Sequence, residues 1–419
     1  MAPRPLLPAL LLGLCAWSAA AAQTTYTPTE LRDGVDEQLD NEDFDGAIWG
    51  AYIADLESEE VLYARNSNAM LIPASNMKLV TTAAALDALG PDHAFVTRLY
   101  AHGEIRDSTL YGRLVVRGAG DPRFGGRYRG DDLARAFRGW ADSLKAAGVY
   151  EVLGAVVVAD DMIEDPDAYF VRSLRRQLRR GGIRLASDSL RVHEGRSSPD
   201  YGAFRRVASH RSPPLWEFVE VTNTDSNNLY SERILRTLAG YRFPSPGPVS
   251  GLLRRRTADD FLDKIGVDPQ TFVIADGSGL SRSNRLTPVG ITRLLREMWE
   301  HPDPSTRQAF VRSLPLGGRT GTLKDRYRSG DARSNVRAKT GYIRRVRTLS
   351  GYVTTATGRT LVFSLMCNGY TTSTRRVNRA QDAVVELLAD YEGAPVQRAS
   401  MRRTTPRRRA TAPRRDGGR

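Results

Sequence analysis

Three short strings of the sequence, taken together, describe a serine acyl-transfer site. They are Ser75-Asn76-Met77-Lys78, Ser226-Asn227-Asn228 and Lys339-Thr340-Gly341. Each string alone is a weak signal, because a helix cap, an Asn-rich turn or a strand end produces it often. The three in this order demand a fold that brings distant parts of the chain to one place, which is a strong constraint.

Ser75 and Lys78 are spaced to act on each other. Residues three apart lie on one face of a helix, one turn apart. The alanine-rich stretch 79–86 that follows predicts a buried helix, with Ser75 at its start. Free backbone N–H groups collect there, and they can stabilise the oxyanion of an acyl-transfer reaction.

A serine hydroxyl needs a base that takes its proton. The five histidines lie outside any recognisable triad context, and the sequence has no G-x-S-x-G elbow and no H-E-x-x-H zinc motif. The base is therefore predicted to be Lys78, with its pKa lowered by burial and by a nearby positive charge that Lys339 can supply. A zinc site likewise has no support in the sequence.

Chemistry suggests roles for the second string. Ser226 can relay a proton between Lys78 and the leaving amine. Asn228 can form a hydrogen bond with the peptide group of the substrate. Both are therefore predicted catalytic residues, together with Lys339.

The third string suits substrate binding. Lys339 and Thr340 can hold a carboxylate by charge and hydroxyl, and Gly341 lets a peptide lie close against a strand edge. The backbone N–H groups of Ser75 and Tyr342 are expected to form the oxyanion hole. Thr340, Gly341 and Tyr342 are the predicted substrate-binding residues.

The first 22 residues are typical of a cleaved secretory signal. Arg4 supplies the positive end, residues 6–14 an apolar stretch too short to span a membrane, and residues 20–22 a small-residue cleavage site. Leu14 is too large for the usual lipidation signal at Cys15. The chain is therefore expected to be exported to the periplasm or cell envelope, with cleavage near Ala22.

Cleavage would leave Cys367 as the only cysteine. One cysteine cannot form an internal disulfide, so the exported chain must be stable through its core alone. Cys367 ends an apolar, strand-like run, which favours an inert packing role.

The formal charge of +13 is unevenly placed. Residues 398–419 hold nine arginines and one aspartate, a net +8, among Thr, Pro, Ala and Gly. This composition predicts a disordered basic tail. An exported tail meets anionic envelope surfaces before nucleic acid, so no nucleic-acid partner is expected; surface anchoring and a tail with no specific partner both stay open.

The order of elements predicts an α/β (α+β) fold. Strands are expected at 47–55, 61–65, 336–340, 348–354 and 360–367, and helices at 133–147, 226–238, 258–265, 288–299 and 377–391. Ser75 lies near the start of the chain and the other two strings lie in its second half. The residues between them are therefore predicted to include an inserted domain. The expected division is signal peptide 1–22, main domain 23–91, inserted domain 92–205, main domain 206–397 and tail 398–419.

These motifs resemble those of penicillin-binding proteins and serine β-lactamases. The chain is most similar to the D-alanyl-D-alanine carboxypeptidase/endopeptidase branch, the low-molecular-mass class C penicillin-binding proteins, which carry a large insertion between the first two motifs. The resemblance covers about residues 45–390. Further matching strings lie at 73–79, 118–122, 276–282, 321–323, 337–341 and 349–352.

The resemblance implies a β-lactamase/transpeptidase-like domain, with an antiparallel sheet flanked by helices, carrying a smaller inserted domain. It implies that Ser75 is acylated by peptidoglycan stem peptides ending in D-Ala-D-Ala and by β-lactam antibiotics. It implies neither a metal nor an organic cofactor. Two positions depart from the family pattern: Asn227 replaces a frequent Asp, and Tyr342 replaces a small hydroxyl residue.

Two alternatives remain at this stage. A serine β-lactamase shares the acylation chemistry, although the inserted region and the glycine-rich turn at 276–279 argue against it. A non-catalytic wall-binding protein on the same scaffold is disfavoured because every motif residue is present. The balance between carboxypeptidase and endopeptidase activity is left open by the sequence.

Overall fold

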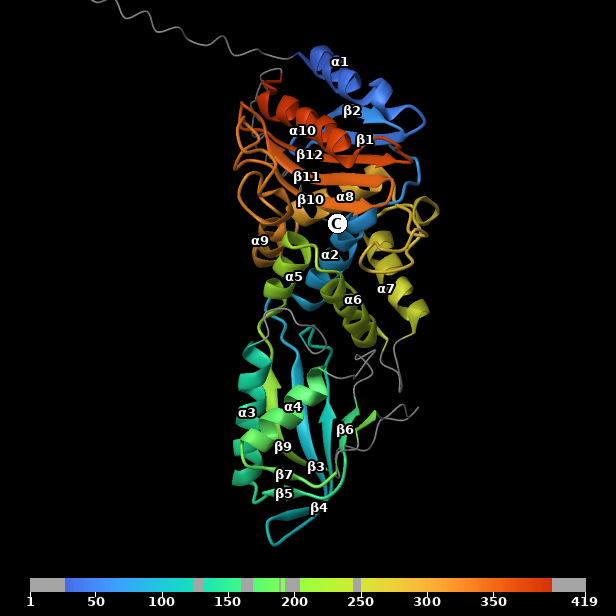
Figure 1. Cartoon of the computed structure of the whole chain (residues 1–419). Coiled ribbons are helices and arrows are strands. Elements are labelled where there is room, and N and C mark those ends of the chain that lie inside the picture. Colours follow the sequence, from blue (N-terminus) through green and yellow to red (C-terminus); the bar gives the residue numbers. More distant parts are fainter. Residues whose placement is uncertain are drawn as a thin grey trace, which may run out of the picture.

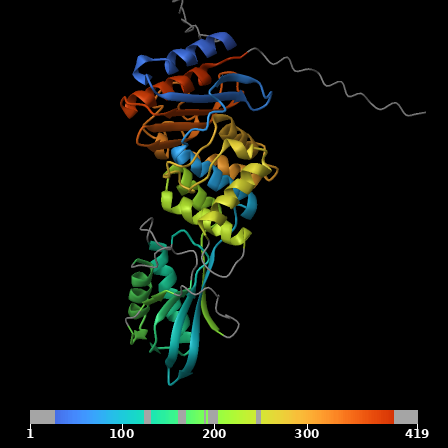
Figure 2. The same cartoon turned by 90° about the vertical axis from the view of Figure 1, so that its right-hand side faces the viewer.

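The computed structural model describes residues 27–123, 131–159, 169–187, 190–192, 204–243 and 250–393. The predicted signal peptide and basic tail lie outside these residues. Two bodies are stacked end to end, the upper built from the first and last parts of the chain and the lower from its middle (Figures 1 and 2). No helix in the described ranges is both long and apolar enough to cross a membrane.

The upper body is built on an antiparallel sheet in the order β10-β11-β12-β1-β2. Its strands are β1 (Ile48–Asp55), β2 (Val61–Arg65), β10 (Arg337–Ile343), β11 (Val346–Thr354) and β12 (Thr360–Asn368). The central β12 is buried on both faces, which explains its unbroken apolar run. Cys367 lies in it, and burial raises the pKa of its thiol to about 12, so the thiol is inert at neutral pH.

Helices cover both faces of this sheet, as the sequence predicted (Figure 1). One face carries α1 (Pro28–Leu39) and α10 (Thr374–Asp390). The other shares its core with α2 (Met77–Leu89), α5 (Leu215–Thr224), α6 (Asn228–Arg242), α7 (Gly251–Lys264), α8 (Pro288–Trp299) and α9 (Pro304–Ser313). Residues 77–86 of α2 are all buried, so this helix is surrounded and needs no polar face.

Capping residues account for most helix starts. Thr27, Thr287 and Asp303 cap α1, α8 and α9, and each is followed by proline at the first helical position. The expected helix 288–299 coincides with α8. The helix expected at 258–265 begins earlier, at Gly251, because Ser250 caps it. Helices α1, α5 and α9 were not anticipated.

The lower body has its own sheet in the order β7-β5-β4-β3-β9, with β6 beside β4 and β8 beside β6. The strands are β3 (Val96–Arg106), β4 (Thr109–Arg117), β5 (Glu151–Val152), β6 (Val156–Ala159), β7 (Arg184–Leu185), β8 (Leu190–Val192) and β9 (Arg205–Arg211). This sheet runs to Arg211, because β9 pairs with β3. The expected boundary at 205 therefore falls where β9 begins, not where the sheet ends.

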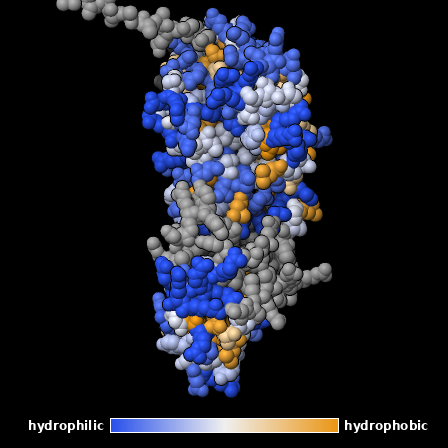
Figure 3. Space-filling model, in the orientation of Figure 1, coloured by the Kyte–Doolittle hydropathy of each residue, from blue (hydrophilic) through white to orange (hydrophobic). Residues whose placement is uncertain are grey.

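Helices α3 (Asp131–Ala146) and α4 (Tyr169–Arg180) pack on the lower sheet and form a separate core with it. Leu174 and Leu178 of α4 are fully buried, whereas its arginines at 172, 176, 179 and 180 face solvent. Figure 3 shows the resulting hydrophilic patch over α4. The basic stretch of the sequence is thus the outer face of an amphipathic helix.

The string at 118–122 lies at the joint between the two bodies. Gly120 has a φ of 76° and faces Thr237 of α6, whose Oγ1 would lie 2.0 Å from a Cβ at this position. Asp121 is buried there with Arg123 and accepts a hydrogen bond from its Nη2 at 2.7 Å. A glycine is needed where the lower body meets α6 so closely.

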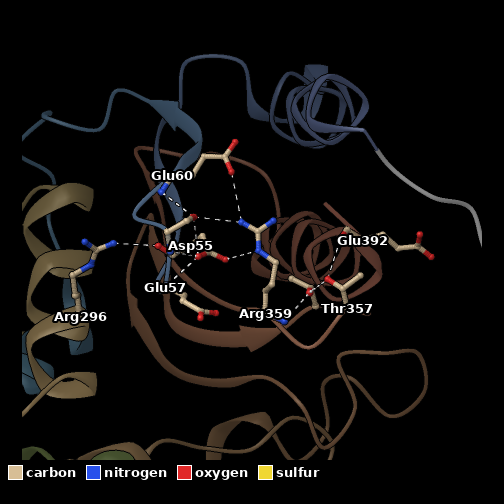
Figure 4. A network of polar contacts seen from close by, with 9 residues as sticks. Asp55, Glu57, Glu60, Arg296, Thr357, Arg359 and Glu392 are labelled. Atoms are coloured by element: carbon tan, nitrogen blue, oxygen red, sulfur yellow. Dashed lines mark hydrogen bonds and ion pairs between the residues drawn. The ribbon is translucent and has the colours of Figure 1, made fainter. Parts of the chain in front are cut away.

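Asp55, at the end of β1, joins three parts of the upper body (Figure 4). Its carboxylate accepts hydrogen bonds from the backbone N–H groups of Glu57 and Ser58 and from Nε of Arg359, at 2.9, 2.6 and 2.9 Å. Its carbonyl accepts one from Arg296 of α8 at 3.1 Å. Burial by itself would raise the pKa of Asp55, but the Ser58 hydrogen bonds and the Arg359 charge outweigh it and lower that pKa.

Arg359→Gln should therefore lower the free energy of unfolding by about 3 kcal/mol, because it leaves the Asp55 carboxylate buried without its cation. The loss should be present above about pH 4 and shrink as the pH falls further, since the pKa of Asp55 is lowered on folding. Urea unfolding measures it. The control is Arg328→Gln, whose ion pair with Asp325 is 75% and 65% exposed and should cost no more than about 1 kcal/mol. Equal losses in the two variants would contradict this account.

Candidate active site

Ser75 lies on a tight turn between the sheet and α2. The turn is the 3₁₀ segment Ala74–Asn76, which leads directly into α2 below β10 (Figure 1). Two strand side chains fix it: Thr348 donates a hydrogen bond to the carbonyl of Pro73 at 2.9 Å, and Asn76 donates one to Oγ of Ser350 at 2.6 Å. Ala74 has a φ of 45°, so the turn is held in a conformation that a non-glycine residue rarely adopts.

Lys78 is fully buried one turn along α2, and its amine meets three acceptors. Its Nζ lies 3.0 Å from Oγ of Ser75, 2.7 Å from Oδ1 of Asn228 and 2.5 Å from the carbonyl oxygen of Ser278. A charged ammonium can donate to all three. The neutral amine can donate to two and accept the hydroxyl proton of Ser75.

The Ser278 carbonyl is aimed by the glycine-rich turn at 276–281. The carboxylate of Asp276 accepts from the backbone N–H groups of Gly279 and Ser281 at 2.7 and 2.6 Å. Glu232 of α6 accepts from those of Gly277 and Ser278 at 3.0 and 2.8 Å. Asp276 thus fixes the shape of the turn and Glu232 ties it to α6, while Thr81 of α2 donates a hydrogen bond to the carbonyl of Gly277 at 2.8 Å.

Burial lowers the pKa of Lys78 to about 8, although the negative charges of Asp276 and Glu232 oppose the shift. The amine is therefore neutral in a substantial fraction of molecules near neutral pH. That is the state in which it can take a proton from Ser75.

Lys339 is the second buried lysine of the site. Its Nζ donates to Oγ of Ser226 at 3.0 Å and to the carbonyl of Thr340 at 2.9 Å. Its pKa is held well below the usual range by burial and by the charges of Lys78 and Arg347. We expected the charge of Lys339 to lower the pKa of Lys78. The two ammonium groups repel each other, so each disfavours the charged form of the other.

Ser226 and Asn228 flank the start of α6. The expected helix began at Ser226, but α6 starts at Asn228, and Ser226 lies outside it with a φ of 57°. Asn227 caps the helix, its Oδ1 accepting from the backbone N–H of Tyr230 at 3.0 Å. An aspartate can do the same, which explains why Asn is tolerated at this position.

Strand β10 forms one edge of the upper sheet and lies against the Ser75 turn. A Cβ on Gly341 would lie 2.1 Å from Oγ1 of Thr348 and 3.0 Å from the backbone nitrogen of Ser75, so glycine is required here. Thr340 donates to Oγ1 of Thr322 at 2.8 Å. Tyr342 is 54% exposed at the rim.

The backbone of β10 presents donors along this edge. Ala338 donates its N–H away from β11, to the carbonyl of Pro315. Alternation along a strand directs the N–H of Tyr342 to the same side. The N–H of Tyr342 therefore points to the open edge of the sheet, one residue after Gly341, which packs against the Ser75 turn.

The structure brings the residues of all three strings together. It adds contacts to which the sequence reading assigned no role: the Ser278 carbonyl, the Glu232 carboxylate and the Thr322 hydroxyl. Ser278 and Thr322 lie in the strings at 276–282 and 321–323, which match the family pattern. The sequence therefore pointed to these segments but not to the role of either residue. Within the described ranges, no group of three or more His, Cys, Asp or Glu side chains is placed to hold a metal ion.

The fold and the site define a class: a β-lactamase/transpeptidase-like protein in which a buried lysine contacts a serine one helical turn away. A family model described as D-Ala-D-Ala carboxypeptidase 3 (S13) matches residues 31–165 and 161–391. The chain belongs to this family and is a serine-type D-Ala-D-Ala carboxypeptidase, which confirms the predicted resemblance.

Individual relatives agree with this placement. A D-alanyl-D-alanine carboxypeptidase of Actinomadura sp. (strain R39) is 29% identical over 495 aligned residues, covering 93% of this chain and 89% of the relative. The carboxypeptidase DacB of Haemophilus influenzae is 24% identical, covering 78% and 87%.

Solved structures show the same fold. Penicillin binding protein 4 (dacB) from Haemophilus influenzae superposes with a TM-score of 0.70 at 20% identity, covering 84% of this chain and 97% of that one. A predatory endopeptidase from Bdellovibrio bacteriovorus superposes with a TM-score of 0.56 at 14% identity, covering 82% and 92%.

Gly279→Ala should damage the site from outside the reacting groups. The added Cβ would lie 1.8 Å from the carbonyl oxygen of Ala74, and φ is +85°, so the turn carrying Ser75 must move. We expect a loss of about 3 kcal/mol in unfolding free energy. Acylation by penicillin should slow by about 100-fold, because misplacing a reacting group by about 1 Å costs that much.

The matched control for this variant is Gly358→Ala. It has a similar φ of +82° but no atom within 4 Å of the added Cβ, so it carries the backbone penalty of about 1 kcal/mol alone. Urea unfolding and the acylation rate separate the two variants. Similar behaviour of both would show that contact with the Ser75 turn is unimportant.

Proposed function

We propose that Ser75 is the nucleophile of this carboxypeptidase and Lys78 its general base. The observation that carries the proposal is the buried Nζ of Lys78, 3.0 Å from Oγ of Ser75, with a pKa lowered to about 8. No other base is required to activate the hydroxyl.

In the first half-reaction, Oγ of Ser75 loses its proton to the neutral Lys78 amine and attacks the carbonyl carbon of the penultimate D-Ala. The backbone N–H groups of Ser75 and Tyr342 stabilise the oxyanion of the tetrahedral intermediate. When the C–N bond breaks, the departing amine of the terminal D-Ala takes a proton through the hydroxyl of Ser226. An acyl ester on Ser75 and free D-Ala result.

In the second half-reaction, the Lys78 amine is neutral again, because the proton it took from Ser75 has left with the D-Ala amine. Water gives a proton to this amine and attacks the ester carbonyl. The ester C–O bond breaks, and Oγ of Ser75 regains a proton from Lys78. The stem peptide leaves one residue shorter. Asn228 supports both steps, because its Oδ1 orients the Lys78 amine at 2.7 Å while its amide can bind the substrate.

Recognition of the terminal carboxylate falls to the Lys339 region. Lys339 supplies positive charge, and the paired hydroxyls of Thr340 and Thr322 supply donors close to it. Burial and repulsion from Lys78 keep the pKa of Lys339 low, so an anionic substrate would help it to hold its proton. Binding a carboxylate therefore biases the proton toward Lys339 and leaves Lys78 free to act as base.

We propose endopeptidase activity as a second activity of the same site. Cutting a cross-link breaks the same kind of bond, a D-Ala carbonyl joined to an amine, with a larger leaving group. β10 is an edge strand and Tyr342 is exposed at its rim, so a second peptide can approach that edge. Supporting this, one structural neighbour is a predatory endopeptidase.

β-Lactams are proposed as inhibitors that acylate Ser75. Their strained amide presents a carbonyl to the same nucleophile, and their carboxylate matches the Lys339 region. A complex of the Haemophilus influenzae penicillin binding protein 4 with a β-lactam supports this.

We also propose that the chain is exported through the signal at 1–22, and that its basic tail at 398–419 contacts anionic envelope surfaces.

Ser75→Ala should abolish the covalent penicillin adduct and both peptidase activities. The wild-type protein should gain the mass of one penicillin on the peptide that contains Ser75, and the adduct should last many minutes. With purified muropeptides, release of D-Ala from monomers measures carboxypeptidase activity, and conversion of dimers to monomers measures endopeptidase activity. Peptidase activity retained in Ser75→Ala would identify a different nucleophile, and rapid loss of the adduct would indicate a β-lactamase.

The acylation rate should rise with pH and level off above about pH 8, because Lys78 acts as a base only when neutral. Lys78→Arg keeps the positive charge but cannot lose its proton, and should slow acylation by about 10²- to 10⁴-fold. Stopped-flow measurement of penicillin acylation from pH 6 to pH 10 tests this. A profile that falls across that range would assign the base elsewhere.

A further inference from the structure

The upper body has a hollow whose lining includes no residue of the three strings. It encloses about 820 Å³ between the end of α8, the helix α9 and the first residue of β10. Three arginines line it: Arg307 and Arg312 from α9, and Arg337 from β10. Trp299 forms part of its wall, and no carboxylate is among its lining residues.

The positive charge of this hollow is uncompensated. Among the described residues, none of the three arginines forms an ion pair. The carboxylate of Asp303, at the start of α9, is occupied by the backbone N–H groups and hydroxyls of Ser305 and Thr306.

Arg312 also borders a neighbouring hollow, which Asp92 and Glu220 line. Neither of these carboxylates forms an ion pair with it within the described residues. Arg312 therefore keeps its charge available to the hollow that Arg307 and Arg337 also line.

Arg337 carries its charge at a cost, because it is partly buried and lies near the charge of Arg312. Burial and the charge of Arg312 lower the pKa of Arg337, which is half-buried. Its guanidinium donates only a long hydrogen bond of 3.4 Å to the carbonyl of Leu314. Holding guanidinium groups together without an anion is unfavourable, and an anion placed between them would relieve the repulsion.

The wall of the hollow is rigid. Trp299 packs against Tyr352 of β11 with ring centroids 5.1 Å apart, and the Tyr352 hydroxyl donates to the carbonyl of Leu295 at 2.6 Å. Tyr352 is the cross-strand partner of Arg337. The arginine side chain therefore starts from a fixed point beside an aromatic surface, which limits the entropy lost when it binds a ligand.

We propose that Arg307, Arg312 and Arg337 form a binding site for an oxyanion, a phosphate or carboxylate group carried by a polyanionic ligand. Guanidinium groups bind both kinds of group through paired, charge-assisted hydrogen bonds. The site is separate from the catalytic residues: Arg337 precedes Thr340 by three residues of β10, about 10 Å along the strand.

One segment links the two sites. Leu316 pairs with Arg337 as an isolated bridge, and Thr322, a few residues on, receives the hydrogen bond of Thr340. An anion bound at the arginines therefore touches the same strand and the same segment that shape the carboxylate-binding end of the catalytic cleft.

Isothermal titration calorimetry at low salt tests the site, with inorganic pyrophosphate as the phosphate probe and tricarballylate as the carboxylate probe. Arg312→Gln and Arg337→Gln should each weaken binding of at least one probe by about tenfold or more. Arg328→Gln, which removes an exposed arginine outside the hollow, is the matched control and should change binding less than twofold. Lys339 can also bind anions, so the difference between variants is the decisive quantity.

The two probes distinguish the sources of the anion. Preference for pyrophosphate would indicate a phosphate-bearing polymer, and preference for tricarballylate a carboxylate-rich peptide. Thermal melting and the penicillin adduct on Ser75 verify that each variant is folded with an intact active site. Binding of both probes that is unchanged in Arg312→Gln and Arg337→Gln, or no binding by the wild-type protein, would overturn the proposal.

Discussion

The amine of Lys78 is the point on which the arrangement of this molecule depends. It is buried without a carboxylate in direct contact and is held by acceptors from three separate segments, at Ser75, Asn228 and Ser278. Taking an ammonium group out of water is costly, and three good hydrogen bonds offset only part of that cost. The remainder appears as a lowered pKa, which is the property that a general base needs. The cost of burying the Lys78 ammonium and the ability of its amine to act as a base therefore have the same physical origin.

Close backbone contacts position Ser75, the proposed nucleophile. The turn carrying Ser75 is held between β10 on one side and the 276–281 turn on the other, and Gly341 and Gly279 are the residues that permit this approach. A Cβ at either position would meet the backbone of the Ser75 turn at 3.0 Å or less. The Ser75 hydroxyl is thus placed by main-chain packing, while the polar side chains around it determine where its proton goes.

The sequence predicted which residues of the site meet better than it predicted how the fold holds them. Which residues should meet followed from the needs of acyl transfer, and Pro288 after Thr287 marked a helix start that holds in the structure. The role of Ser278 could not be foreseen, because it acts through its backbone carbonyl, and a carbonyl leaves no trace in residue identity. The conformation of Ser226 could not be foreseen either. Its φ of 57° keeps it outside the helix in which the sequence placed it. The helix α9 was missed because its sequence is short and mostly polar, and its stability comes from the Asp303 cap and from packing against α5.

The position after K-T-G shows how the site can tolerate an unusual residue. Tyr342 projects to the rim and is 54% exposed, so its ring does not fill the cleft. The hydroxyl that a smaller residue would have provided has neighbours that can substitute for it, since Thr340 and Thr322 already form a pair 2.8 Å apart beside Lys339. The backbone N–H of residue 342 is present whichever side chain this position carries. In the proposed mechanism acylation depends on that backbone group, whereas the exposed ring can contact only the outer part of a substrate. The substitution then bears on substrate preference more than on the reaction itself.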